Sequence, residues 1–317
     1  MSAMLPLNTL GATGHRVTPV TLGGAPLGSW PQQYGGDEVP ISQAIDVVHA
    51  ALDAGIRTID TSNGYCGGES ERRIGIALRE YGALPPDTLV ITKVDPLGSD
   101  YSGERVRRSL AESSGRLGIQ PLPIVHLHDP EFHDFDYLTA PGGAVAALVA
   151  AKESGDVGHI GLAGGDTRVT SRYWDLGVFD LLLIHNRWTL VDRSAGGLLA
   201  CAEADGAALI NAAVLGAGAL TDSPRVFGKY AYHAAPPQLL AAIGEMRSVC
   251  RSFDTTLDTA AVRFSTRDSR FATTVIGMSS PDHVARNLAA ATADLPDELF
   301  TALEALLPAP ELWLDRR

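Results

Sequence analysis

The stretch RTIDTSNGYCGGESERRIGIALREYGALPPDTLVITK, residues 57–93, contains one full repeat of the pattern that decides the fold. A short apolar run ends at Asp60, helical spacing follows over Glu69–Tyr81, and a second apolar run covers Leu89–Lys93. Apolar runs without alternation indicate strands that are covered on both faces, as in parallel sheets. We therefore interpret this stretch as a strand, a helix and a second strand parallel to the first.

The same alternation extends from this stretch toward both ends of the chain. Eight such units favour a closed parallel α/β barrel ringed by helices, with an open doubly wound sheet as the competing architecture. We expect one domain over residues 1–317, with an N-terminal extension and a C-terminal helix. Strands are predicted over Thr18–Leu22, Arg57–Asp60, Leu89–Lys93, Ile124–His128, His159–Ala163, Asp180–Ile184, Ala208–Ala212 and Thr273–Ile276. Helices are predicted over Ile41–Ala54, Glu69–Tyr81, Gly103–Leu117, Ala144–Ser154, Thr167–Leu176, Ala195–Ala204, Gln238–Ser252, Leu257–Thr266, Pro281–Ala290 and Asp297–Leu306.

Charge and cysteine content restrict the classes of partner and compartment. The chain has 25 Lys and Arg residues against 37 Asp and Glu residues, so nucleic acids and anionic membranes are not expected as partners. Three scattered cysteines, Cys66, Cys201 and Cys250, indicate a reducing compartment rather than a disulfide framework. The N-terminus lacks the features of a signal peptide, and the longest weakly polar stretch, Gly206–Leu220, is too short to span a bilayer. We expect a cytoplasmic protein, and a homo-oligomer is compatible with the sequence.

Polar side chains stand at the ends of three consecutive predicted strands. Asp60 ends the second strand, Lys93 the third and His128 the fourth, and Tyr65 follows Asp60 by five positions. In a parallel barrel the chemistry lies at the carboxyl ends of the strands and in the loops that follow them. We therefore expect these four side chains to meet at one mouth of the barrel.

These four groups form a coherent set for moving a proton. A phenol has a pKa of about 10, and a nearby ammonium lowers it by favouring the phenolate. A carboxylate keeps a buried ammonium charged, and a neutral imidazole can orient a carbonyl oxygen. Tyr65 would then protonate a carbonyl or deprotonate an alcohol while a hydride moves to or from a cofactor such as a nicotinamide.

Each of the four residues also has an ordinary structural interpretation. Asp60 and His128 can serve turns, since each precedes turn-forming residues. Lys93 can be a surface residue at a strand end, and Tyr65 can be loop packing. Their placement on consecutive strands is what favours the functional interpretation.

A metal site is the second interpretation of the histidines. His126 and His128 are two positions apart on a strand and point to the same face, as ligands do in metal-dependent hydrolase barrels. His133, Asp134 and Asp136 follow them. A catalytic zinc needs three protein ligands in fixed geometry, and no clear further ligand set is present, so we expect no metal.

Four segments carry a recognisable signature: Asp60–Tyr65, Gly68–Gly75, Ile91–Lys93 and Leu127–Asp129. This signature resembles that of the aldo-keto reductase superfamily, and the spacing of the segments agrees with that family over nearly the whole chain. The resemblance implies a (β/α)8 TIM barrel and a nicotinamide dinucleotide bound in an extended form. It implies that Tyr65 is the general acid/base, that Lys93 and Asp60 tune its pKa, and that His128 orients the substrate oxygen.

The resemblance also implies a set of cofactor-binding residues. Asn186 would hold the carboxamide and Trp188 would stack on the nicotinamide, although Trp188 can also belong to the core. The loop after the seventh strand would pass the pyrophosphate, and the helix after Ser280 would bind phosphate at its N-terminus. Ser280 can also be an N-cap alone. The full set is Asn186, Trp188, Ala212, Leu215, Gly216, Gly277, Ser280, His283 and Asn287.

Two departures from the family pattern concern the cofactor. Many members have Ser-Asn after the fifth strand, where this chain has Gly164–Gly165, so backbone groups are expected to replace that contact with the carboxamide. Members that prefer NADP carry an arginine or lysine near the 2′-phosphate, and the corresponding segment here is Met278–Ser280. Arg286 is nearby in the sequence, but the pattern favours NAD over NADP.

Gly164–Gly165 and Asn186–Leu190 resemble the branch of D-threo-aldose 1-dehydrogenases, or L-fucose dehydrogenases, which is similar to pyridoxal 4-dehydrogenases. That resemblance implies an NAD(P)-dependent oxidation of a sugar hemiacetal carbon to a lactone, with Trp30 and Cys66 as candidate substrate contacts. Trp30 can also be a loop residue at the solvent edge. The alternatives are a pyridoxal 4-dehydrogenase or general aldehyde and ketone reductase, a metal-dependent hydrolase, and a nicotinamide-binding regulator without turnover.

Overall fold

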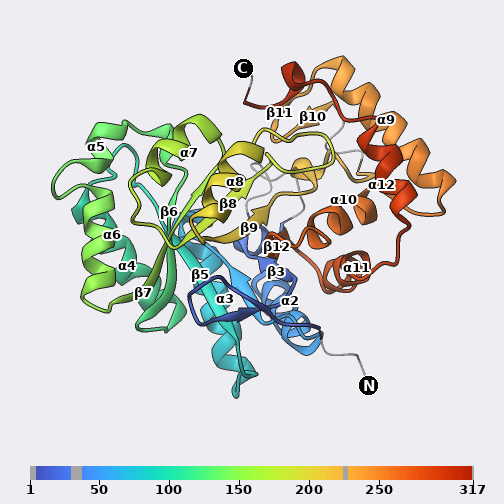
Figure 1. The fold of residues 1–317 in the computed structure, drawn as a ribbon. Coiled ribbons are helices and arrows are strands. Elements are labelled where there is room, and N and C mark those ends of the chain that lie inside the picture. Colours follow the sequence, from blue (N-terminus) through green and yellow to red (C-terminus); the bar gives the residue numbers. More distant parts are fainter. Residues whose placement is uncertain (1–4, 30–37, 224–227, 316–317) are drawn as a thin grey trace.

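Eight parallel strands form a closed barrel in the computed structural model, which describes residues 5–29, 38–223 and 228–315 (Figure 1). The strands follow one another around the barrel in chain order, and the last strand pairs with both the first and the seventh. This closure excludes the open doubly wound sheet, and each barrel strand overlaps a predicted one. The barrel strands are β3 (Val20–Gly23), β4 (Thr58–Asp60), β5 (Leu89–Val94), β6 (Leu122–His128), β7 (Val157–Gly164), β8 (Leu181–His185), β9 (Ala208–Ala212) and β12 (Phe271–Gly277).

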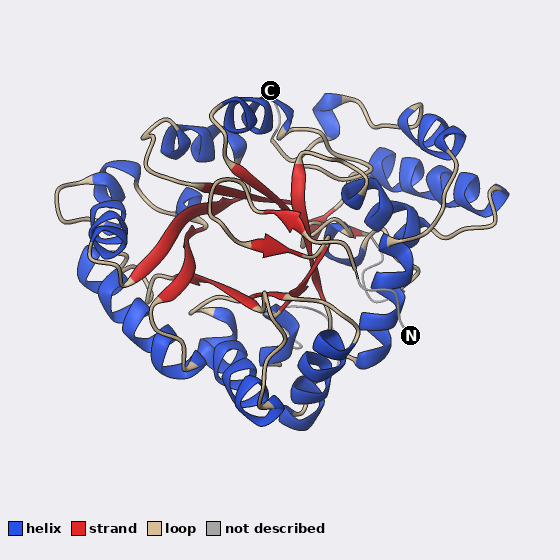
Figure 2. Cartoon of the chain, turned by 60° about the horizontal axis from the view of Figure 1, so that its bottom comes forward, coloured by secondary structure: helices blue, strands red, loops and turns tan. Residues whose placement is uncertain are grey.

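Helices cover the outside of the ring of strands (Figure 2). In the helix after β4, the buried residues Ala77 and Leu78 follow the buried Ile74 by three and four positions, which places all three on one face. Every residue of β5 and β9 is buried, because one strand face fills the barrel and the other meets helices. The helices are α2 (Ile41–Asp53), α3 (Glu69–Tyr81), α4 (Gly103–Leu117), α5 (Phe135–Thr139), α6 (Ala144–Glu153), α7 (Thr167–Trp174), α8 (Gly196–Ala204), α9 (Pro237–Ser252), α10 (Leu257–Thr266), α11 (Pro281–Ala291) and α12 (Asp297–Glu304).

A hairpin of β1 (Asn8–Thr9) and β2 (Arg16–Val17) closes the N-terminal end of the barrel. Leu10 and Val17 are fully buried in one apolar cluster with barrel residues such as Ile91. The side chain of Asn8 donates a hydrogen bond to a backbone carbonyl near the start of β12, 2.8 Å away. The predicted N-terminal extension therefore plugs the end of the barrel that lies away from the polar strand ends.

A second hairpin, β10 (Lys229–Tyr230) and β11 (His233–Ala234), follows the loop after β9. Tyr230 packs on Gly216, whose φ is +58°, and a Cβ at that glycine would lie 2.5 Å from the tyrosine ring. The amide of Ala231 also donates to the carbonyl of Gly216, at 3.2 Å. These contacts hold the hairpin against the loop that leaves the carboxyl end of β9.

The structure adds short elements that hydrophobic periodicity did not predict. They are the two hairpins, with strands of two residues, and α5, with five residues. Elements this short span too few residues for a period to be recognised. None of the described helices has both the length and the apolar character needed to cross a membrane.

Candidate active site

The Lys93 ammonium lies at the centre of the polar group at the carboxyl end of the barrel. Parallel register places Asp60, the last residue of β4, beside Ile91 of β5, two residues before Lys93. Lys93 Nζ donates to Asp60 Oδ1 at 2.6 Å, to Thr61 O at 2.8 Å and to Tyr65 Oη at 3.2 Å. An ammonium has three hydrogens, and these three acceptors use all of them.

Burial sets the energetics of this ion pair. Lys93 is 1% exposed and Asp60 is 3% exposed, so Lys93 is not the surface residue that the sequence also allowed. Burial raises the pKa of the Asp60 carboxyl, and the positive charge of Lys93 acts against that rise. Asp60 Oδ2 has no hydrogen-bond partner among the described residues, so the ammonium is the main compensation for the buried carboxylate.

Tyr65 begins a short 3-10 segment, Tyr65–Gly68, in the loop after β4. Positive φ at the two residues after Tyr65 turns the chain sharply there. The Tyr65 ring centroid lies 4.7 Å from Lys93 Nζ, and the ring meets the His128 imidazole edge-on, with 5.5 Å between centroids. The structure thus brings Tyr65, Lys93, Asp60 and His128 together, and their catalytic roles stay a prediction.

His128, the last residue of β6, has carboxylates near both ring nitrogens. Its Nδ1 lies 2.6 Å from Asp95 Oδ1, and its Nε2 lies 3.7 Å from Asp129 Oδ1. Burial lowers the pKa of His128, but the charges of Asp129 and Asp95 outweigh it, and the net pKa is raised. The neighbouring carboxylates therefore shift the His128 equilibrium toward the imidazolium, whereas the sequence analysis considered a neutral imidazole.

Asp95 is a functional candidate that sequence reasoning missed. Burial raises its pKa, but the His128 charge and hydrogen bonds from Ser62 and Gly64 outweigh burial, and the net pKa is lowered. A signal was present in the sequence, because Asp95 follows Lys93 by two positions, the spacing that puts two side chains on one face of a strand.

His126 does not join His128 as a metal ligand. Its imidazole is fully buried, which lowers its pKa well below the usual value. Neither ring nitrogen has a hydrogen-bond partner among the described residues, and a Cβ at Gly161 would lie 2.2 Å from its Nδ1. Asp134, in the acidic segment after β6, caps α5 by accepting from the amide of Tyr137. These placements assign His126 to the barrel interior and Asp134 to a helix cap.

Asp129, Glu131 and His185 form a second polar cluster beside His128. Their donor atoms lie within 4.8 Å of one another, which is the spacing of metal ligands. Hydrogen bonds within the protein occupy part of this cluster, since His185 Nε2 lies 3.3 Å from Asp129 Oδ1 and Glu131 Oε1 accepts from the amide of Gly165. Glu131 Oε2 is buried without a hydrogen-bond partner among the described residues. A glutamate from the β6 loop therefore takes up a backbone amide where many members of the resembled family have Ser-Asn.

Asn186 is a buried side chain suited to holding a carboxamide. It follows β8, has a φ of +60° and is 1% exposed. Its Nδ2 lies 3.2 Å from His185 Nδ1, and its backbone carbonyl accepts from Tyr230 Oη at 3.0 Å. Its Oδ1 is buried without a partner among the described residues. Buried acceptors are normally satisfied, so this oxygen fits the amide hydrogens of a nicotinamide carboxamide.

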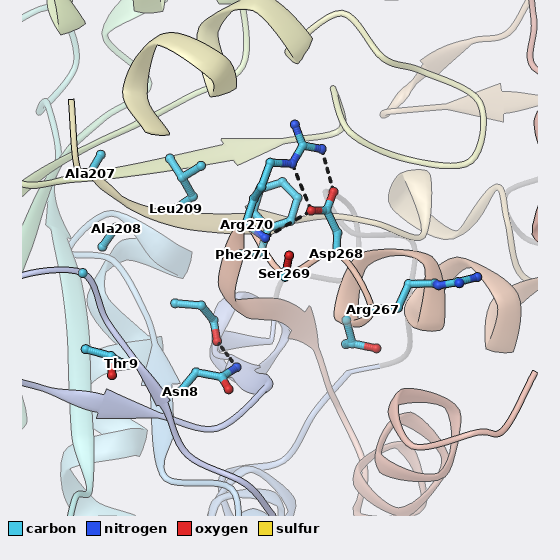
Figure 3. Close-up of a pocket in the computed structure, with 13 residues that line it drawn as sticks. Asn8, Thr9, Ala207, Ala208, Leu209, Arg267, Asp268, Ser269, Arg270 and Phe271 are labelled. Carbon is cyan, nitrogen blue, oxygen red and sulfur yellow. Dashed lines mark hydrogen bonds and ion pairs between the residues drawn. The ribbon is translucent and has the colours of Figure 1, made fainter. Parts of the chain in front are cut away.

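Trp188 is committed to other contacts. Its Nε1 donates to Asp268 Oδ2 at 3.0 Å, and its indole stacks on Phe264 with 6.3 Å between centroids. Asp268 and its ion-pair partner Arg270 line a pocket at the first residues of β9 and β12 (Figure 3). This is the N-terminal end of the barrel strands, whereas Lys93 lies near their carboxyl end. These contacts are those of a packed side chain, and the stacking of Trp188 on nicotinamide stays a prediction.

The N-terminus of α11 is a candidate site for the phosphates. Ser280 is its N-cap, and Ser280 Oγ accepts from the amide of His283 at 3.3 Å. His283 Nδ1 lies 3.2 Å from Ser279 Oγ, and burial lowers the pKa of His283. Their contacts with a cofactor stay predictions. The remaining predicted residues lie at the ends of β9 and β12, in the turn after β9 or on α11: Ala212, Leu215, Gly216, Gly277 and Asn287.

Of the two predicted substrate contacts, Trp30 lies outside the described residues. Cys66 Sγ donates to Ala25 O at 3.6 Å, and burial raises the pKa of the thiol. A Cβ at Gly28 would lie 2.4 Å from Cys66 Cβ, so the side chain is packed against the loop after β3. Its contact with substrate stays a prediction.

The barrel, together with the relatives of this chain, defines an oxidoreductase that uses NAD(P) as its cofactor. The chain matches the Aldo/keto reductase family over residues 19–308 and belongs to that family, which confirms the resemblance seen in its motifs. It is 30% identical over 312 residues to L-galactose dehydrogenase of Arabidopsis thaliana, covering 96% of this chain and 94% of that protein. It is 30% identical over 331 residues to D-threo-aldose 1-dehydrogenase of Pseudomonas sp, covering 94% and 97%. It is 28% identical to pyridoxal 4-dehydrogenase of Microbacterium luteolum, covering 93% and 96%.

Solved structures agree with the fold. An aldo-keto reductase from Bacillus halodurans, in its holo form, aligns with a TM-score of 0.81 at 19% identity. The alignment covers 99% of this chain and 100% of that chain. A glycerol dehydrogenase from Gluconobacter oxydans aligns with a TM-score of 0.74 at 20% identity, covering 98% and 97%. At these identities the likeness shows the (β/α)8 barrel and no more.

Proposed function

We propose that this aldo/keto reductase oxidises the hemiacetal carbon of a cyclic aldose to a lactone, with Tyr65 as the general acid/base. The observation that carries the proposal is the hydrogen bond from Lys93 Nζ to Tyr65 Oη, donated by an ammonium that is buried beside Asp60. A cationic donor at the phenolic oxygen stabilises the phenolate, which is the form that takes a proton from an alcohol.

The oxidation breaks the C1–H and O–H bonds of the sugar hemiacetal. A bound oxidised nicotinamide would supply the acceptor for the C1 hydrogen, which leaves with its electron pair as a hydride. The hydroxyl proton passes to the Tyr65 phenolate, and the C1–O bond becomes the carbonyl of the lactone. His128 orients the reacting oxygen, and Asn186 Oδ1 accepts from the carboxamide of the cofactor. Reduction of a carbonyl uses the same groups with each transfer reversed.

A sugar substrate is supported by the polar groups next to His128 and by two relatives. Asp129 places a carboxylate beside His128, with its Oδ1 3.7 Å from His128 Nε2, and this carboxylate can accept from a sugar hydroxyl. The relatives named L-galactose dehydrogenase and D-threo-aldose 1-dehydrogenase match nearly the whole chain. A pyridoxal 4-dehydrogenase is the second candidate, since a protein of that name also matches over nearly the whole length.

A substrate screen tests the proposed reaction. L-Galactose, L-fucose, other aldoses, pyridoxal and simple aldehydes are each assayed with NAD and NADP in both directions, following the absorbance of the reduced nicotinamide. We expect turnover of an aldose, with the matching lactone detected by mass spectrometry. Turnover of pyridoxal and of no aldose would replace the proposal with the second candidate, and binding of cofactor without any turnover would favour a regulator.

The same screen tests cofactor choice, for which we propose NAD. The segment Met278–Ser280 at the start of α11 carries no cationic side chain. Burial, and then the charge of the nearby Arg286, lower the pKa of His283, which disfavours a positive charge on this imidazole. We expect a higher kcat/KM with NAD than with NADP, and the opposite order would contradict this assignment.

Asn186→Gly is expected to weaken cofactor binding selectively. Glycine tolerates the positive φ of this position, so the change removes the side chain without straining the backbone. Loss of one hydrogen bond to the carboxamide should raise the Kd for NAD by about 3- to 10-fold. ADP-ribose, which lacks the nicotinamide, is the control ligand and should bind both proteins equally. Calorimetry measures the Kd of both ligands. An equal rise in the Kd for NAD and for ADP-ribose would assign Asn186 to loop structure instead.

A further inference from the structure

We propose that Asp95 is a positioning residue of this active site, because one carboxylate holds both the His128 imidazole and the loop that carries Tyr65. The proposal rests on the proposed function and adds a residue outside the four-residue set predicted above. Asp95 follows the end of β5, two positions after Lys93. Its side chain is 12% exposed, equal to that of His128.

The two oxygens of the carboxylate serve two different partners. Oδ1 accepts from His128 Nδ1 at 2.6 Å, and a carboxylate can only accept, so Nδ1 carries the hydrogen. Oδ2 accepts from the amide of Gly64 at 2.6 Å and from the hydroxyl of Ser62. Gly64 directly precedes Tyr65, so the Asp95 carboxylate sets the position of both the Tyr65 loop and the His128 imidazole.

The chain around Asp95 keeps this carboxylate in place. The amide of Asp95 donates to Ser109 Oγ at 3.3 Å, and its carbonyl accepts from Arg105 Nε at 3.1 Å. A Cβ at Gly64 would lie 2.8 Å from Asp95 Cγ, so only glycine allows the loop to approach this closely. A side chain fixed at both its backbone and its carboxylate has little freedom to release His128.

His128 is surrounded by charged groups from several elements. The carboxylates are Asp95 after β5, Asp129 after β6 and Asp60 at the end of β4, and the cation is Lys93 on β5. The pKa of the nearby His126 is well below its usual value, so that imidazole is neutral. Three carboxylates against one ammonium favour the imidazolium. With Nδ1 bound to Asp95, Nε2 is the ring donor that remains for the substrate oxygen.

Asp95→Asn removes the charge of this side chain and keeps its size. Asp180→Asn is the matched control, because Asp180 also faces a histidine, with His159 Nδ1 at 3.3 Å, and a backbone amide, with Ile160 N at 3.3 Å, but it precedes β8 at the other end of the barrel. We expect kcat to fall by about 10- to 100-fold in Asp95→Asn, which is part of what a positioned proton donor contributes. The Kd for NAD should not change, and the control should retain wild-type kcat.

The pH profile separates positioning from a structural role. Asp95→Asn should move the kcat inflection that reports His128 to lower pH, and nuclear magnetic resonance of 15N-labelled histidine should show the same shift for the His128 ring. The His128→Gln variant assigns that signal by removing it. Asp180→Asn should leave both measurements unchanged. An unchanged inflection and an unchanged His128 titration in Asp95→Asn would overturn the proposal.

Stability gives a second readout that needs no substrate. The pKa of Asp95 is lowered and that of His128 is raised, so the pair stabilises the fold fully between the unfolded values of about 4 and about 6.5. The contribution is lost as pH falls through the folded pKa of Asp95 or rises through that of His128. Urea unfolding of Asp95→Asn should therefore show a larger loss at about pH 5.5 than at about pH 9.

The outcomes distinguish this proposal from the proposed function. If wild type turns over an aldose, Tyr65→Phe does not, and Asp95→Asn keeps wild-type kcat and pH profile, only the role of Asp95 fails. If Tyr65→Phe remains active, the proposed function fails, and the His128 titration still decides what Asp95 does. If Asp95→Asn does not fold, the titration of His128 in wild type decides, and a pKa at or below that of an exposed histidine contradicts the proposal.

Discussion

Replacing Tyr65 with phenylalanine is expected to abolish turnover while leaving the nicotinamide cofactor bound. Phenylalanine keeps the ring that meets His128 edge-on and lies near Lys93 Nζ, but it lacks the oxygen that exchanges the proton. Positioned proton transfer contributes about 10²- to 10⁴-fold to a rate, so kcat should fall by at least that range. Steady-state kinetics with the best aldose of the screen measures kcat, and fluorescence titration measures the Kd for NAD.

The matched control for this variant is Tyr81→Phe. Tyr81 also has a hydrogen-bonded hydroxyl, which donates to Asp53 Oδ1 at 2.7 Å, but it lies at the end of α3, away from the barrel mouth. It should keep wild-type kinetics. Substantial remaining activity in Tyr65→Phe would remove the proposed proton donor. A loss of NAD binding as large as the loss of kcat would assign Tyr65 to cofactor binding instead.

Lys93→Met is expected to remove activity and also to destabilise the fold. Methionine has a similar length but no charge, so Tyr65 Oη loses its cationic donor and kcat should fall about as far as in Tyr65→Phe. Asp60 is left as a buried carboxylate without its cation, and breaking a buried pair in this way costs about 3–5 kcal/mol. Urea denaturation measures the free energy of unfolding.

The pH dependence of this variant has a definite sign. Burial already raises the pKa of Asp60, and without Lys93 only the weaker influence of the His128 charge opposes that rise. A carboxyl whose folded pKa exceeds its unfolded value lowers stability as pH rises above the unfolded value. The stability loss of Lys93→Met should therefore shrink at acidic pH, where Asp60 holds a proton.

The double variant Lys93→Met with Asp60→Asn separates the two effects. It removes both buried charges, so most of the stability should return at neutral pH, while activity should stay absent because the donor to Tyr65 is still missing. Full stability of Lys93→Met alone at neutral pH would show that Asp60 does not depend on the Lys93 charge. Activity in the double variant would show that Tyr65 does not need it either.

The site residues that were predictable stand at strand ends. Asp60, Lys93 and His128 each end a strand with a clear apolar pattern, and parallel strands bring their carboxyl ends to one edge whatever the details of packing. Tyr65 was placed by its distance from Asp60 and by motif resemblance. The local pattern of strand and helix was therefore enough to predict this group.

Side-chain direction in loops was not predictable. Trp188 follows β8 as expected, but its indole turns to Asp268 and Phe264, residues that are distant in the sequence and adjacent only in the folded barrel. The sequence analysis did not identify Asp95 as a site residue, because its importance depends on two contacts made at once, with His128 Nδ1 and with the amide of Gly64.

The sequence by itself determined the eight βα units, the closed barrel as the favoured architecture and the family. Periodicity and strand-end polarity are local properties, and they persist in any fold that buries those strands. Only the tertiary structure decided which acceptors the Lys93 ammonium contacts, that His128 lies between two carboxylates, and that Asn186 Oδ1 is buried with no hydrogen-bond partner in the described part of the chain. Those facts depend on distances of a few ångströms between segments far apart in the chain, and the charge state of a buried group follows from its neighbours rather than from its own position in the sequence.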